Sequence, residues 1–105
     1  MPRIAVTIFD TTLEKFINSL ETQTIAKVLR TIDLLEEFGS ELGMPHSKKV
    51  TDRIFELRIH GAQNVRIFYA YIHGGAMLLS GFLKKSSKTP RREIETAKHK
   101  LHSLD

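Results

Sequence analysis

The sequence predicts an α+β fold in which an antiparallel sheet carries its helices on one face. Two observations lead to this prediction. Apolar residues recur at helical spacing between residues 13 and 35, and from Phe55 onward they alternate with polar residues, as in half-buried strands. The 105 residues, 41% of them hydrophobic, suit one domain over residues 1–105 with a single core. The expected order of elements is β-α-α-β-β-β-α.

The N-terminal part is predicted to form a short strand and a helical hairpin. Residues 4–9 favour a strand, and Thr11 and Glu14 after them have the spacing of a capping box. Two apolar series at helical spacing follow and end at Gly39, a residue type that is common just after a helix. Two amphipathic helices are therefore expected before this glycine.

A loop, three strands and a last helix are predicted for the rest of the chain. Residues 40–52 show no periodicity and are expected to form a loop of about a dozen residues, a length often associated with function. Strands are predicted over residues 55–60, 65–72 and 76–83, the last two joined by a tight turn that contains two glycines. Pro90, a residue type favoured at the first helical position, begins the last helix.

Positive charge is concentrated in the C-terminal part of the chain. Residues 1–45 carry 4 basic and 7 acidic side chains, a net charge of −3, whereas residues 46–105 carry 12 and 5, a net charge of +7. This asymmetry favours a polyanion as partner, with nucleic acid first and a membrane surface second. The lack of cysteine excludes disulfides and thiolate metal sites. No signal peptide or spanning segment of about 20 apolar residues is recognised, so a cytoplasmic protein is expected.

The basic stretch at residues 81–94 predicts a phosphate-binding rim. Here an apolar strand ends at Lys84 and Lys85, and hydroxyl and basic residues lead into a helix. Arg58 and Arg66 lie on neighbouring strands at positions that can share one face. For a single lysine the alternative is a solvated strand edge, because exposed lysines discourage pairing between sheet edges.

Arg66 is the strongest candidate for a functional residue. It interrupts a strand that is otherwise almost entirely apolar, which indicates either pairing with Glu56 or phosphate binding. His46 in the long loop and His60 at a strand end are further candidates. Phe82 ends the third strand, where an aromatic ring at the rim is able to stack on a base. The remaining histidines lack a third metal ligand nearby, so no metal or cofactor is expected.

Three segments carry a resemblance to a known family: ELR at residues 56–58, RIFY at residues 66–69 and GFLKKSSKTP at residues 81–90. Together, over about residues 50–102, they resemble the phage-derived, HigB-like branch of the RelE/ParE toxin superfamily. The resemblance implies a compact RelE-like fold and the toxin of a type II toxin–antitoxin pair. It further implies ribosome-dependent mRNA cleavage that inhibits translation, and a small helix-turn-helix, HigA-like antitoxin as partner, through which alone the protein would meet DNA.

The resemblance also implies roles for the basic residues in a metal-independent attack of the RNA 2′-hydroxyl on the adjacent phosphate. Arg66 would hold that phosphate with Arg58 beside it, and Lys84 or Lys85 would take the place of the catalytic basic residue of the family. Proton transfer would also involve His46 or a lysine of the long loop. The remaining residues expected to contact RNA are Lys48, Lys49, Arg53, Lys88, Arg91 and Phe82. The alternatives are a non-catalytic toxin that binds a protein such as DNA gyrase, and an inactive RNA-binding remnant.

Overall fold

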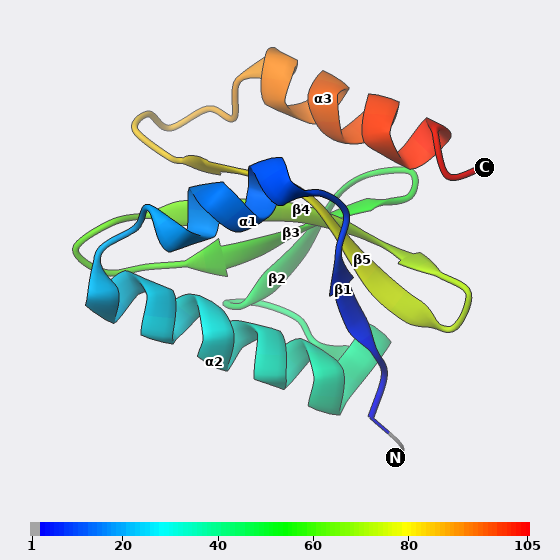
Figure 1. Ribbon diagram of the computed structural model, residues 1–105, viewed down its shortest axis with the longest axis horizontal. Helices are drawn as coiled ribbons and strands as arrows, with labels where there is room; N and C mark the ends of the chain where they lie inside the picture. Colours follow the sequence, from blue (N-terminus) through cyan, green and yellow to red (C-terminus); the bar gives the residue numbers. More distant parts are fainter. Residues whose placement is uncertain (1–2) are drawn as a thin grey trace.

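A five-stranded sheet in the order β1-β5-β4-β3-β2 organises the computed structural model, which describes residues 3–105 (Figure 1). The strands are β1 (Val6–Ile8), β2 (Ser47–Thr51), β3 (Ile54–Ile59), β4 (Val65–Ile72) and β5 (Gly75–Leu83). The helices are α1 (Thr11–Asn18), α2 (Thr22–Phe38), the short 3-10 helix η1 (Gly39–Glu41) and α3 (Arg91–His102). The α+β class and the two-helix hairpin between the first strand and the main sheet are as predicted.

The sheet differs from the prediction in two ways. It is mixed and not antiparallel, because β1 runs parallel to β5, with Val6 opposite Ala76. It also contains a strand, β2, inside the predicted loop of residues 40–52, so the order is β-α-α-β-β-β-β-α. This strand forms because Val50 and Thr51 are β-branched and the short turn after them folds β2 back along β3, with Lys48 opposite Glu56.

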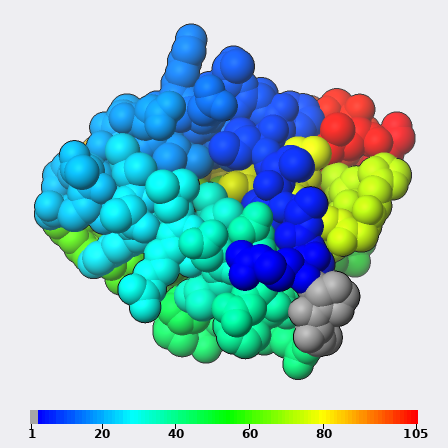
Figure 2. Space-filling model, turned by 60° about the horizontal axis from the view of Figure 1, so that its bottom comes forward, coloured from blue at the N-terminus to red at the C-terminus, as the bar shows by residue number. Residues whose placement is uncertain are grey.

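The helices cover both faces of the sheet, where the sequence predicted one. The first apolar cluster joins α1 and α2 to one face, and Figure 2 shows these helices, blue to cyan, covering most of the visible surface. A second cluster joins α3 to the opposite face through Ala97 and Leu101, which pack against Phe68, Ala70 and Leu79. The second layer is required because β4 is apolar on both sides, and a bare apolar face would remain in water.

Asp10, and not the predicted Thr11, caps the first helix. Its Oδ1 accepts a hydrogen bond of 3.0 Å from the backbone N–H of Leu13. Lys100 of α3 lies 3.0 Å from Asp10 Oδ2 and donates a hydrogen bond of 2.9 Å to the carbonyl oxygen of Leu79. The cap therefore joins the helices of the two faces.

Candidate functional site

Charged side chains gather on the face that α3 covers only in part. Arg58 of β3 lies directly opposite Arg66 of β4, so the two side chains share one face, as the sequence predicted. Glu56 precedes Arg58 by two positions and lies on that face as well. We call these three residues the arginine cluster.

The carboxylate of Glu56 holds the arginine cluster together. Its Oε1 lies 3.6 Å from Arg58 Nε and 3.6 Å from Arg66 Nε. The side chain of Arg66 is only 4% exposed and that of Glu56 7%, whereas Arg58 is 22% exposed. Like charges directly opposite each other on adjacent strands repel, and the single carboxylate offsets only one of the two. The cluster therefore keeps a net positive charge.

Unused hydrogen-bond donors remain in and beside this cluster. Four buried side-chain polar atoms in the described part of the chain lack a hydrogen-bond partner, and three of them are Arg58 Nε, Arg66 Nε and Lys84 Nζ. Lys84 follows the end of β5, where its backbone N–H bonds the carbonyl oxygen of Asn64 at 2.8 Å. By strand alternation its side chain points to the same face as Arg66. Buried donors without hydrogen-bond partners are rare. Arg58 Nε and Arg66 Nε face the Glu56 carboxylate beyond hydrogen-bond distance, so Lys84 Nζ in particular suits an anionic ligand.

The electrostatics of Arg66 also favour an anion. Burial lowers the pKa of its guanidinium, the Glu56 carboxylate raises it, and the neighbouring Arg58 lowers it again, with a net lowering. The group stays charged at any physiological pH, since the guanidinium does not lose its proton in proteins. Keeping the buried guanidinium charged therefore costs free energy, and a phosphate bound beside it would reduce that cost.

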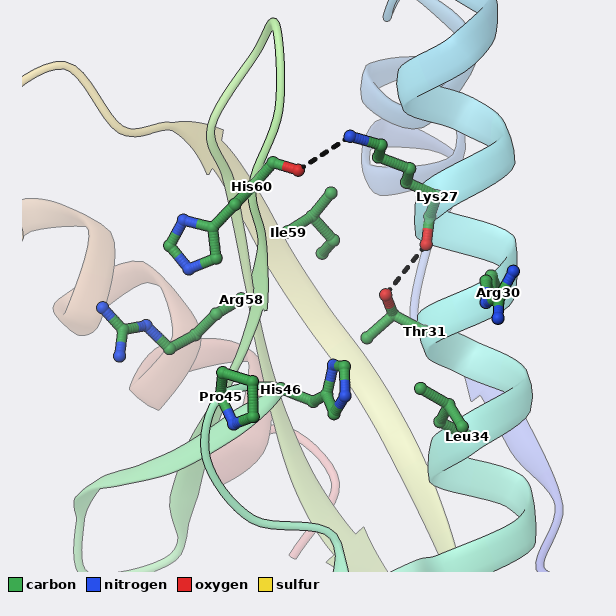
Figure 3. Close-up of a pocket in the computed structure, with 9 residues that line it drawn as sticks. All are labelled: Lys27, Arg30, Thr31, Leu34, Pro45, His46, Arg58, Ile59 and His60. Carbon is green, nitrogen blue, oxygen red and sulfur yellow. Dashed lines mark hydrogen bonds between the residues drawn. The ribbon is translucent and has the colours of Figure 1, made fainter.

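His60, which the sequence marked only as a strand-end candidate, belongs to this face. It continues the alternation of Glu56 and Arg58, and its imidazole lies on the same side of β3 as the Arg58 side chain (Figure 3). Partial desolvation and the charges of Arg66 and Arg58 lower its pKa below the usual 6.5, against a hydrogen bond with Asn64 that raises it. The ring is therefore neutral near pH 7 and able to accept a proton.

The other predicted site residues are distributed around this centre. Lys48 lies opposite Glu56 and so points to the face of the arginine cluster, whereas Lys49, one position on, points to the other face. Arg53 lies in the turn between β2 and β3 and forms an ion pair of 3.1 Å with Asp105. Lys49 and Arg53 thus lie apart from the cluster.

The loop after β5 and the start of α3 are solvent-exposed at Lys85, a predicted catalytic residue, and at the predicted RNA contacts Lys88 and Arg91. Phe82, in contrast, is 7% exposed, and its ring lies 5.6 Å from that of Phe68 in the apolar cluster under α3. Little of this ring is left to stack on a base.

His46 is not on the same side of β3 as the arginine cluster. Its imidazole points into the space between β3 and α2, while the side chains of Arg58 and His60 extend from the opposite side of the strand (Figure 3). His46 lines a cavity there together with Lys27 and Arg30 of α2. The two imidazole rings therefore lie on opposite sides of β3 (Figure 3), although both histidines line this cavity.

Fold and site together define a small α+β protein with a cationic face prepared for an anion. The chain matches the family model described as "Phage derived protein Gp49-like (DUF891)" over residues 15–102 and belongs to that family of RelE/ParE-like toxins. The family is associated with the toxins of toxin–antitoxin systems, which implies a cognate antitoxin as partner. No curated protein matches the chain. Among residues 3–105, no helix combines the length and apolar character needed to cross a membrane.

Proposed function

We propose that this protein is a HigB-like toxin, a single domain over residues 1–105 that cleaves mRNA on the bacterial ribosome without a metal ion and so stops translation. The observation that carries the proposal is the pair of arginines held by Glu56, with unused donors on Arg58, Arg66 and Lys84 directed to one face. A helix-turn-helix, HigA-like antitoxin would neutralise it in the cytoplasm.

Arg66 would bind the scissile phosphate, with Arg58 beside it. As the 2′-oxygen attacks phosphorus, negative charge grows on the non-bridging oxygens, and fixed guanidinium donors stabilise that charge more than they stabilise the ground state. One such donor is typically worth about 10²–10³ in rate. Lys48, which points to the same face from β2, would add a further cation.

Two proton transfers complete the reaction. The 2′-hydroxyl gives its proton to the neutral imidazole of His60 as the bond between O2′ and phosphorus forms. The bond from phosphorus to O5′ then breaks, and Lys84 or Lys85 protonates the leaving oxygen. The products are a 2′,3′-cyclic phosphate and a free 5′-hydroxyl. His60 replaces His46 in this scheme, because His46 faces α2.

The first test is to map mRNA 5′ ends after brief expression of the wild type and of Arg66→Ala from a tightly repressed promoter. We expect new cuts within translated codons that disappear in Arg66→Ala. Arg53→Ala is the matched control, because it also removes one arginine but lies in an ion pair outside the cluster. Growth arrest without cuts would indicate a protein target such as DNA gyrase, and the lack of both effects would indicate a binding module.

A further inference from the structure

A second basic site adjoins the arginine cluster at the end of β3. It is a cavity of about 230 Å³ between α2 and β3 (Figure 3). Its polar lining comes from Lys27, Arg30, Thr31, His46, Arg58 and His60, and its apolar wall is formed by Leu34, Pro45 and Ile59. At about 30 Å³ for each water molecule, the space equals roughly eight waters, enough for a phosphate and part of its sugar.

The two cations that α2 contributes to this cavity have no acidic partner within the described residues. Among residues 3–105, the ion pairs of the protein involve other side chains, and no carboxylate lies within 4.0 Å of the charged atoms of Lys27 or Arg30. Lys27 is nevertheless held in place, because its Nζ donates a hydrogen bond of 3.0 Å to the carbonyl oxygen of His60. An ammonium group has three donors, so two remain for a ligand.

The cavity adjoins the arginine cluster at the end of β3, because Arg58 and His60 line the cavity as well. The paired register of β2 and β3 ends where Ser47 lies opposite Leu57, and beyond it a single backbone hydrogen bond joins Arg58 to His46. Arg58 and His60 point to one side of this segment, and Lys27 reaches its backbone from the other (Figure 3). A flexible chain bound at the cluster is therefore able to cross this narrow edge and reach the cavity.

We propose that the cavity between α2 and β3 is a second phosphate-binding site, which holds a phosphodiester of RNA beside the mRNA phosphate at the arginine cluster. Its cations would bind the phosphate oxygens, and Leu34 and Pro45 would pack against the ribose. The inference rests on the proposed function for the identity of the chain as RNA. The phosphate comes from the mRNA or from ribosomal RNA, and the experiment below distinguishes these sources.

The test compares the double variant Lys27→Gln/Arg30→Gln with the control Lys15→Gln/Lys98→Gln, which removes the same charge from α1 and α3. The first probe is a fluorescent 2′-O-methyl RNA hexamer, which has no 2′-hydroxyl and is not cleaved. We expect the cavity variant to bind about tenfold more weakly at 0.1 M KCl and to lower the slope of log K against log[KCl] by about 0.7 for the one phosphate lost. The second probe is co-sedimentation with ribosomes that carry no mRNA.

Each outcome decides a separate point. Weaker hexamer binding assigns the phosphate to mRNA, and weaker binding only to empty ribosomes assigns it to ribosomal RNA. If the cavity variant equals the control with both probes, the second site does not exist. That result would not affect the proposed function, because mRNA cleavage by the wild type would remain. If instead the wild type binds RNA through the cavity but does not cut mRNA, the proposed function is wrong and the second site stands.

Gly61→Ala gives a test at constant net charge. A Cβ at Gly61 would overlap Lys27 Nζ, so the ammonium must move while its charge remains. We expect hexamer binding to weaken by about threefold, the usual range for one displaced surface charge contact. Unchanged binding, with an unfolding temperature equal to that of the wild type, would show that the position of Lys27 does not matter and would count against the site.

Discussion

The two faces of β3 and β4 are buried to a similar degree but by opposite chemistry. On the face toward α1 and α2, Leu57 and Ile67 are fully buried among apolar residues. On the other face Glu56 and Arg66 are 6% and 4% exposed, although they are charged. Apolar burial stabilises the fold directly, whereas buried charges rarely do so and are kept where they serve another purpose. The apolar residues therefore stabilise the sheet, whereas the charged residues are positioned by it.

The charged face is itself divided along the strands. Under α3, the end of the sheet that contains Ile54 and Ala70 is apolar. At the other end, where β3 finishes and β4 begins, Arg58 lies opposite Arg66. At this end Arg58, with 22% of its side chain exposed, is accessible to a ligand, whereas the side chain of Arg66 is buried.

The largest expected change in the free energy of unfolding comes from a substitution on the apolar face. Ile67→Ala should destabilise the protein by about 2–5 kcal/mol, because it removes buried methyl groups and leaves a cavity. Urea unfolding measures this change. Arg66→Ala, its neighbour on the other face, should cost less stability but abolish mRNA cleavage. Equal losses of stability from both substitutions would mean that the two faces do not differ in role.

Removing the central carboxylate should have the next largest effect. Glu56→Gln leaves two guanidinium groups without their shared counter-charge, and we expect a loss of about 1–3 kcal/mol. Urea unfolding at low and high salt measures it, since salt screens the repulsion and should reduce the loss. Glu14→Gln on the exposed surface of α1 is the control. A Glu56→Gln protein as stable as the wild type at low salt would show that the arginines do not depend on this carboxylate.

Strand alternation is the part of the site that the sequence could predict. It placed Arg58 beside Arg66, because a period of two leaves no other choice once the two strands pair. It could not place His46, whose direction depends on the packing of α2 against β3. The sequence pattern also did not predict β2, because the two consecutive lysines of this strand are more typical of a loop. The parallel pairing of β1 with β5 was not readable either, since it joins residues 70 positions apart, such as Val6 and Ala76.

The pH dependence of cleavage tests whether His60 works on the charged face. If its neutral imidazole accepts the 2′-hydroxyl proton, the rate should be constant at neutral pH and fall about tenfold for each unit below the pKa of His60. That pKa lies below 6.5, because desolvation, Arg66 and Arg58 all disfavour the charged ring. Single-turnover cleavage on stalled ribosomes between pH 5 and 8 measures this profile. The His46→Gln variant should show the same pH profile as the wild type. If the fall in rate at low pH disappears in that variant, His46 and not His60 is the base.

The smallest effect concerns the link between the faces, where Asp10 caps α1 and pairs with Lys100 of α3. Burial raises the pKa of Asp10, but the hydrogen bond from Leu13 and the interaction with Lys100 outweigh it, so the pKa lies below 3.8. Its contribution is therefore complete above the unfolded value and is lost as pH falls through the lower folded value. Asp10→Asn keeps a capping oxygen and loses only the ion pair, so we expect about 0.5–1 kcal/mol at pH 7 and no difference from the wild type near pH 2. Thermal unfolding across this range measures the difference, and a constant gap at every pH would assign the effect to the cap and not to the bond between the two faces.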